Sequence, residues 1–133
     1  MILIDSNVLF DLLSDDPIWY RWSASALAAA ALESHLAINP VIYAETSVRF
    51  KTPEEFDELF PSSEFRREPL PYAAAFLAAK AHLAYRRSGG VRTSTLPDFF
   101  IGAHAAVAGF RLLTRDARRY RTYFPSVELI APL

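Results

Sequence analysis

Two acidic residues stand directly after short apolar runs, where a carboxylate is well placed for chemistry. Asp5 follows the run at 1–4, and Asp116 follows the run at 111–114 with only Arg115 between. If both runs are strands of one parallel sheet, both carboxylates lie at the edge where such sheets bind ligands. The alternative is that each carboxylate caps the helix or turn that follows it.

Two further acids lie in segments with helical patterns. Glu45 falls within an apolar stripe, which consists of Val41, Ala44 and Val48. A carboxylate in such a stripe is costly unless it is paired or bound to a metal, and Arg49 is the alternative partner. Asp98 is the only charged residue in the segment 96–110, so we expect it to point into the protein or a cleft. Its alternative role is a capping box with Thr95.

Acids that gather at one sheet edge repel one another unless a cation lies between them. Mg²⁺ suits such a site because it prefers oxygen ligands and accepts few protein carboxylates. Bound ions of this kind can activate water and stabilise the leaving oxygen in phosphodiester hydrolysis. Zinc suits it less because the sequence has no cluster of histidines, and the absence of cysteine excludes thiol chemistry.

Short strands and helices alternate along the chain and would position these acids. We expect strands at 1–4, 36–38, 111–114 and 127–130, with a short extended piece at 65–68. We expect helices after Asp5 and at 17–34, 40–50, 53–60, 71–87 and 96–109, with a polar loop at 91–95. This alternation predicts an α/β fold whose central parallel sheet has about four to five short strands covered on both faces by helices.

Length and composition restrict the class of protein. A chain of 133 residues with 52% hydrophobic residues predicts one folded domain, residues 1–133. No apolar run approaches the roughly 18 residues of a membrane span, and no basic stretch precedes the first apolar run. We therefore expect a soluble, intracellular protein that does not contact a membrane.

The motifs together resemble the PIN-domain family, in particular the VapC-type toxins of prokaryotic toxin–antitoxin pairs. The resemblance covers essentially the whole chain. It rests on the opening Ile2-Leu3-Ile4-Asp5-Ser6-Asn7-Val8-Leu9, Glu45, Asp98 with Ile101-Gly102-Ala103-His104-Ala105, Leu112-Leu113-Thr114-Arg115-Asp116, and the tail from Tyr120 through Phe124-Pro125 to Leu129-Ile130-Ala131-Pro132.

The resemblance implies a PIN-like three-layer sandwich and a cytoplasmic endoribonuclease that depends on Mg²⁺ or Mn²⁺. Asp5 and Asp98 match the expected direct metal ligands, and Glu45 and Asp116 would complete the site directly or through water. Supporting polar groups would be Ser6, Asn7 and Thr114. The resemblance also implies a homodimer and a cognate antitoxin that blocks the site.

Basic residues beside Asp116 suggest how RNA would be held. Residues 80–121 are strongly basic and residues 1–64 strongly acidic, an asymmetry that can mark nucleic-acid contact. Arg115, Arg118 and Arg119 are therefore candidate ligands of RNA phosphates, and the alternative is a solvated surface. Some members of the family carry a further acid where this chain has Arg118-Arg119, so the number of metal ions, one or two, stays open.

Two other functions compete with the nuclease. A phosphatase with a strand-terminal aspartate nucleophile commonly uses Asp-x-Asp, but Asn7 stands at the second position. A non-catalytic α/β module would bind RNA or a partner without cleavage. Substitution of Asp98 by Asn separates these readings, because a nuclease loses its activity while a passive binder keeps its binding.

Overall fold

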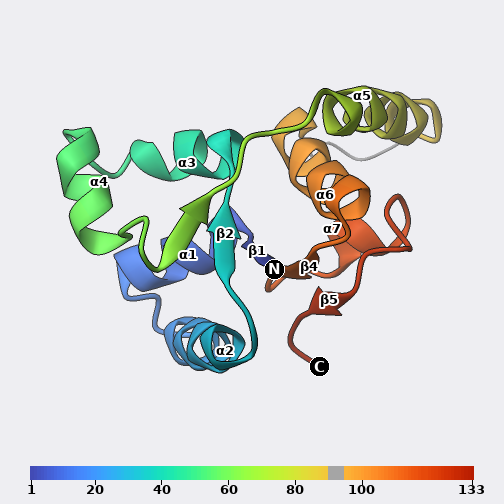
Figure 1. Cartoon of the computed structure of the whole chain (residues 1–133). Coiled ribbons are helices and arrows are strands. Elements are labelled where there is room, and N and C mark those ends of the chain that lie inside the picture. Colours follow the sequence, from blue (N-terminus) through green and yellow to red (C-terminus); the bar gives the residue numbers. More distant parts are fainter. Residues whose placement is uncertain (90–94) are drawn as a thin grey trace.

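A central sheet of five parallel strands organises the computed structural model, which describes residues 1–89 and 95–133. The strands are β1 (Ile2–Ile4), β2 (Leu36–Ile38), β3 (Phe65–Arg67), β4 (Arg111–Leu113) and β5 (Leu129–Ile130). Their order in the sheet is β3-β2-β1-β4-β5, and every neighbouring pair is parallel (Figure 1). The strand order therefore reverses at β1, between β2 and β4.

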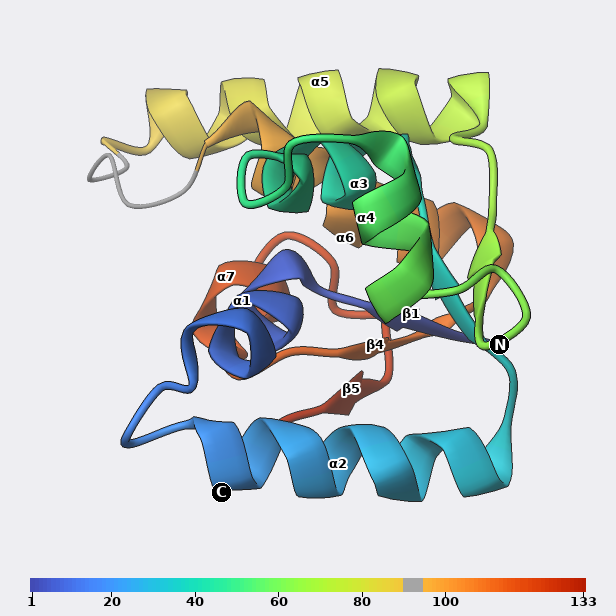
Figure 2. The same ribbon diagram turned by 90° about the vertical axis from the view of Figure 1, so that its left-hand side faces the viewer.

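Helices cover both faces of this sheet, which confirms the predicted α/β fold. In chain order they are α1 (Ser6–Ser14), α2 (Tyr20–Glu33), α3 (Pro40–Ser47), α4 (Pro53–Leu59), α5 (Tyr72–Arg87), α6 (Leu96–Ala108) and α7 (Arg118–Arg121). Figure 2 shows the layers edge-on, with α5 on one side of the strands and α2 on the other.

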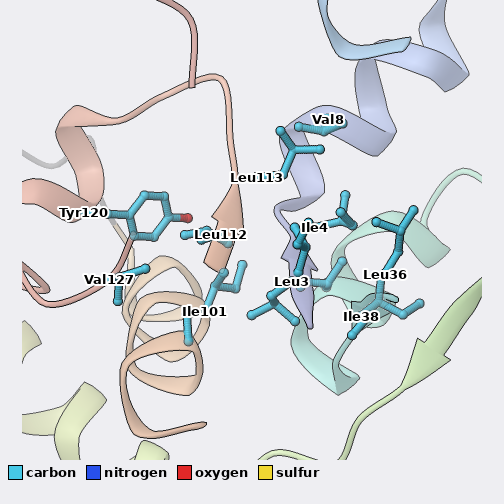
Figure 3. Close-up of a cluster of buried hydrophobic side chains, with 14 of the residues drawn as sticks. Leu3, Ile4, Val8, Leu36, Ile38, Ile101, Leu112, Leu113, Tyr120 and Val127 are labelled. Atoms are coloured by element: carbon cyan, nitrogen blue, oxygen red, sulfur yellow. The ribbon is translucent and has the colours of Figure 1, made fainter. Parts of the chain in front are cut away.

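The core forms where the apolar strands meet the helices. All three residues of β1 are fully buried, because β1 is the central strand and is covered on both faces. Figure 3 shows β1, β2 and β4 contributing Leu3, Ile4, Leu36, Ile38, Leu112 and Leu113 to this cluster. The ring of Tyr120 also lies in the cluster, with its hydroxyl turned toward the strands.

Helices α5 and α6 pack through small residues. The buried positions of α5 are Ala74, Ala78 and Ala81, which recur at helical spacing. The larger apolar residues Tyr72, Phe76 and Leu83 of this helix, which the sequence alone would place on one stripe, are all exposed. Alanines let two helix backbones approach closely, so the large side chains are turned outward.

Two expected helices differ in detail. The helix expected from position 17 begins at Tyr20, because Asp16 Oδ1 accepts hydrogen bonds from the amides of Ile18 and Trp19 and closes a turn first. Helix α3 ends at Ser47 rather than near Phe50. Residues 91–94 of the loop expected at 91–95 lie outside the described residues.

The expected apolar stripe around Glu45 is also wrong in its register. The buried residues of α3 are Ile42 and Thr46, whereas Val48 lies beyond the helix and is 77% exposed. The eight-residue helix is too short for its apolar spacing to define one face.

None of the helices in the described part of the chain is long and apolar enough to cross a membrane.

Candidate active site

The carboxyl ends of β1 and β4 bring together residues that are far apart in the sequence. Ile4 of β1 pairs with Leu113 of β4, and the amide of Asp5 donates to the carbonyl oxygen of Leu113 at 2.9 Å. Asp5 and Thr114 therefore lie side by side at this edge. The strand order reverses at β1, which is where open α/β sheets bind ligands.

Asp5 is the most buried acid at this edge, with 1% of its surface exposed. Its Oδ2 accepts hydrogen bonds from the Tyr120 hydroxyl at 2.7 Å, from Thr114 Oγ1 at 2.9 Å and from Asn7 Nδ2 at 3.3 Å. Although Asp5 stands at the N-cap of α1, its side chain makes no capping hydrogen bond. Its carboxylate thus serves this edge and not the helix start.

No described basic side chain forms an ion pair with Asp5, although the nearby charge of Arg119 lowers its pKa. Burial raises the pKa of Asp5, and the hydrogen bonds from Tyr120 and Thr114 oppose this rise. The three donors crowd Oδ2, whereas Oδ1 has only a long contact of 3.4 Å with Ser6 Oγ. Oδ1 is consequently the oxygen of Asp5 that remains available to a ligand.

Glu45 joins this group through a hydroxyl. Ser6 Oγ donates to Glu45 Oε1 at 2.8 Å, and a hydroxyl has one proton, so this short bond takes precedence over the long contact with Asp5. Burial raises the pKa of Glu45, and the charges of Asp98 and Asp5 act in the same direction. The expected alternative, an ion pair with Arg49, is not present.

Asp98 and Asp116 form a second group around a shared cation. Arg119 Nη1 donates to Asp98 Oδ1 at 2.9 Å, and Arg119 Nε donates to Asp116 Oδ2 at 3.0 Å. The other oxygen of Asp98 accepts from the amide of Thr95 at 3.0 Å, so the capping contact is present beside the ion pair. Asp98 is 6% exposed at the start of α6.

The four acids thus lie in two linked pairs and not in one compact cluster. Within residues 1–89 and 95–133, no group of three or more His, Cys, Asp or Glu side chains is arranged to hold a metal ion. The donor chemistry fits a hard divalent cation, because the site offers carboxylate, hydroxyl and amide oxygens. The obstacle is the arrangement, since Arg119 already occupies oxygens of two acids.

The supporting polar residues tie the two strand ends together. Thr114 Oγ1 donates to Asp5 and accepts from Asn7 Nδ2 at 3.2 Å and from the amide of Asp116 at 3.0 Å. Asn7 Oδ1 in turn accepts from the amide of Arg115 at 3.3 Å. These bonds fix the backbone that carries Asp116 relative to α1.

The three candidate RNA ligands lie in different surroundings. Arg118 is exposed and has no ion pair with any described residue, whereas Arg119 pairs with the acids. Arg115 Nε lies 2.9 Å from Asp11 Oδ2 and 3.1 Å from Asp11 Oδ1, and its guanidinium lies 5.6 Å from the ring centre of Trp19.

Two residues that contribute to this region, Asp11 and Tyr120, are not predicted by the sequence patterns. Asp11 is 1% exposed, and it lies three positions after the buried Val8, a spacing that puts both on one helix face. Tyr120 was noted only as part of the tail motif, and nothing local indicates that its hydroxyl reaches Asp5. His104 of α6 is buried, and its Nδ1 lies 3.0 Å from Asn39 Nδ2.

The chain matches one family model and several solved structures. The model described as the PIN domain matches residues 2–125. A chain from the VapBC2 complex of Rickettsia felis, bound to a promoter DNA fragment, is similar with a TM-score of 0.73 and 17% identity over 98% of each chain. A toxin–antitoxin complex from Klebsiella pneumoniae gives 0.72 and 24% over 100% of this chain and 98% of that one.

FitAcB from Neisseria gonorrhoeae is similar as well, with a TM-score of 0.70 and 19% identity over 98% of this chain and 96% of that one. No curated protein matches the chain significantly. At these identities the solved structures show a shared fold over the whole length.

Proposed function

Because the chain belongs to the PIN domain family, we propose that it is a metal-dependent endoribonuclease and the toxin of a toxin–antitoxin pair. The main support for the proposal is the burial of Asp5 at the end of β1. Its carboxylate is 1% exposed at the switch point of the sheet and forms no direct ion pair with a described basic side chain. A buried carboxylate of this kind is stabilised when a ligand supplies positive charge.

In this proposal Asp5 and Asp98 hold a Mg²⁺ or Mn²⁺ ion directly, and Glu45 and Asp116 complete the site directly or through water. When bound, such an ion supplies the charge that activates water and stabilises the leaving oxygen of a phosphodiester. The products would be a 3′-hydroxyl and a 5′-phosphate.

The chain's own polar residues orient these acids. Thr114 and Tyr120 fix Asp5 through Oδ2, so Oδ1 would be the oxygen that holds the ion. Ser6 holds Glu45, and Asn7 holds Thr114. Each of these residues acts by positioning a carboxylate and not by contact with RNA.

RNA is proposed to bind along the basic segment beside Asp116. Arg118 is the exposed member and offers its guanidinium directly to a phosphate. Arg115 and Arg119 stay candidates, although each already pairs with an acid. A contribution from Arg118 predicts weaker RNA binding and a smaller salt dependence in Arg118→Gln.

Partners and setting complete the proposal. We infer a cognate antitoxin, because the similar structures include complexes named as toxin–antitoxin pairs. We also infer a homodimer and a cytoplasmic location from the resemblance to VapC-type toxins. Light scattering of the purified chain tests whether it is a dimer. Residues 1–133 are inferred to form one domain, since the described apolar residues share one cluster.

Digestion of total RNA by the purified protein tests the enzyme. The reaction contains Mg²⁺ or Mn²⁺, and its controls are EDTA, Asp98→Asn and the matched variant Asp15→Asn, whose side chain is exposed. Discrete fragments should form with the wild type and Asp15→Asn and should vanish with EDTA or Asp98→Asn. Cleavage that survives in Asp98→Asn contradicts the assigned site.

The second candidate is a non-catalytic α/β module that binds RNA or a partner. It is favoured by one observation, namely that no described group of acids is arranged to hold a metal. Under this reading no metal-dependent cleavage occurs, and RNA binding by Asp98→Asn equals that of the wild type.

A further inference from the structure

Arg119 lies between two of the four acids at the strand ends. It uses two different nitrogens, Nη1 for Asp98 and Nε for Asp116, at 2.9 and 3.0 Å. No other basic side chain among the described residues pairs with any of the four acids. Arg119 therefore supplies the positive charge that this edge has in the absence of a ligand.

The contact of Arg119 with Asp98 uses the oxygen that takes no part in the helix cap. Asp98 Oδ2 is engaged by the amide of Thr95, in a bond that secures the start of α6. Only Oδ1 is then free of the helix, and Arg119 Nη1 occupies it. A divalent ion at Oδ1 would face a guanidinium at the same oxygen, and two cations in such close contact repel strongly.

The side chain of Arg119 is partly open to solvent, as its release from this position would require. Its side chain is 34% exposed, and it belongs to the four-residue helix α7. Its neighbours Arg118 and Arg121 are exposed, so this short helix presents basic side chains to solvent. A guanidinium released there is available to a phosphate as a two-pronged donor.

We propose that Arg119 is an internal counter-ion that competes with the divalent cation for Asp98 and Asp116 and is displaced when the cation binds. This inference rests on the proposed function, because it needs the metal site. It adds that a side chain of the protein itself raises the metal concentration needed to fill the site. Arg119 holds the acids together in the metal-free protein and weakens the affinity for the ion.

Metal binding without RNA tests this role. The dissociation constant for Mn²⁺ is measured by calorimetry for the wild type, Arg119→Gln and Arg121→Gln at one ionic strength. Arg121 is exposed in the same helix, and its substitution changes the net charge equally. We expect Arg119→Gln to bind Mn²⁺ at least about tenfold more tightly, which corresponds to about 1.4 kcal/mol. Arg121→Gln should match the wild type.

The melting temperature in EDTA is a second measurement, and here Arg119→Gln should change for the worse although its Mn²⁺ affinity improves. Arg119→Gln should melt at a lower temperature than the wild type, because Asp98 and Asp116 lose their counter-ion. Arg119→Lys keeps the charge but loses the two-pronged geometry. Its Mn²⁺ affinity should therefore lie between those of the wild type and Arg119→Gln. It also serves if Arg119→Gln fails to fold.

The possible outcomes separate this inference from the proposed function. If the wild type binds Mn²⁺ and Asp98→Asn does not, the metal site stands. Equal or weaker binding by Arg119→Gln and Arg119→Lys then overturns the competition alone. If neither the wild type nor the Arg119 variants bind Mn²⁺, both the metal site and the competition are wrong.

Discussion

Arg115 and Arg119 are four residues apart, yet they pair with different acids. Arg119 reaches Asp98 and Asp116, whereas Arg115 reaches Asp11, which is buried and also accepts from Ser23 Oγ at 2.7 Å. At the scale of single residues, an arginine-rich segment thus divides into side chains that pair with acids and two, Arg118 and Arg121, that face solvent.

Arg115 is expected to matter for stability. Arg115→Gln leaves Asp11 buried without its cation, and loss of one partner from a buried ion pair is strongly destabilising. Because Arg115 is itself about one-third exposed, we expect a loss of roughly 1–3 kcal/mol in the free energy of unfolding. Urea denaturation measures it.

Arg118→Gln is the matched control and should change the free energy of unfolding by less than about 0.5 kcal/mol. Equal stability of Arg115→Gln and Arg118→Gln would show that the contact with Asp11 contributes nothing.

At the scale of elements, Gly102 allows α6 to lie close to the C-terminal segment. A Cβ at Gly102 would overlap the ring of Phe124 and would lie 3.0 Å from Tyr120 Cδ1. The absence of a side chain therefore lets Tyr120 pack where its hydroxyl reaches Asp5. One small residue in α6 thus helps to set the position of a hydrogen-bond donor at the strand ends.

Gly102→Ala is expected to destabilise the protein. Alanine favours a helix by about 1 kcal/mol over glycine, but overpacking of a core costs typically about 1–3 kcal/mol. We expect the second effect to prevail, with a lower melting temperature in calorimetry. The double variant Gly102→Ala/Phe124→Leu should recover part of the loss, and an unrecovered loss would mean that the overlap with Phe124 is not its cause.

The start of α3 is linked to α6 by a hydrogen bond between Asn39 and the titratable His104. Asn39 Oδ1 accepts from the amide of Ile42 and caps α3, which leaves its Nδ2 to donate to His104 Nδ1. His104 must therefore be neutral at Nδ1. Burial lowers the pKa of His104, and the charge of Glu68 opposes this shift.

Acid is accordingly expected to weaken this junction. A histidine whose pKa is lower in the folded state contributes stability above its unfolded pKa of about 6.5, and this contribution is lost as pH falls through the folded pKa. The free energy of unfolding should decrease from about pH 7.5 to about pH 5 more steeply in the wild type than in His104→Gln. Parallel pH profiles for the two proteins would contradict the assignment.

At the scale of the whole molecule, the sheet joins acids from its two halves. Asp5 and Glu45 come from the half of the chain before α5, and Asp98 and Asp116 from the half after it. A ligand that bridges the two pairs would stabilise the whole fold, because it binds only when both halves are in place.

Mg²⁺ or Mn²⁺ is therefore expected to raise the melting temperature. A ligand present at about 100 times its Kd stabilises the folded state by about 2.7 kcal/mol. Asp5→Asn should lose this response yet remain folded in EDTA, since an amide oxygen can still accept from Tyr120 and Thr114. Asp15→Asn should respond like the wild type. A full metal response in Asp5→Asn would remove Asp5 from the site.

Much of the architecture was predictable from local patterns. The apolar runs gave four of the strands closely, and proline with a preceding cap residue marked the starts of α3 and α4. Patterns failed where packing decides between faces, as in α3, where Ile42 and Thr46 are buried instead of Val41 and Val48. A short helix contains too few turns for spacing alone to choose its buried side.

The sequence by itself determined which acids follow strands and which stand on helices, because these positions depend on neighbours in the chain. Only the tertiary structure decided the partners of those acids. Tyr120 reaches Asp5 across 115 positions, and Arg119 reaches Asp98 across 21. Such contacts depend on the strand order and on the close approach of α6 to the C-terminal segment, and side-chain type does not encode either of them locally.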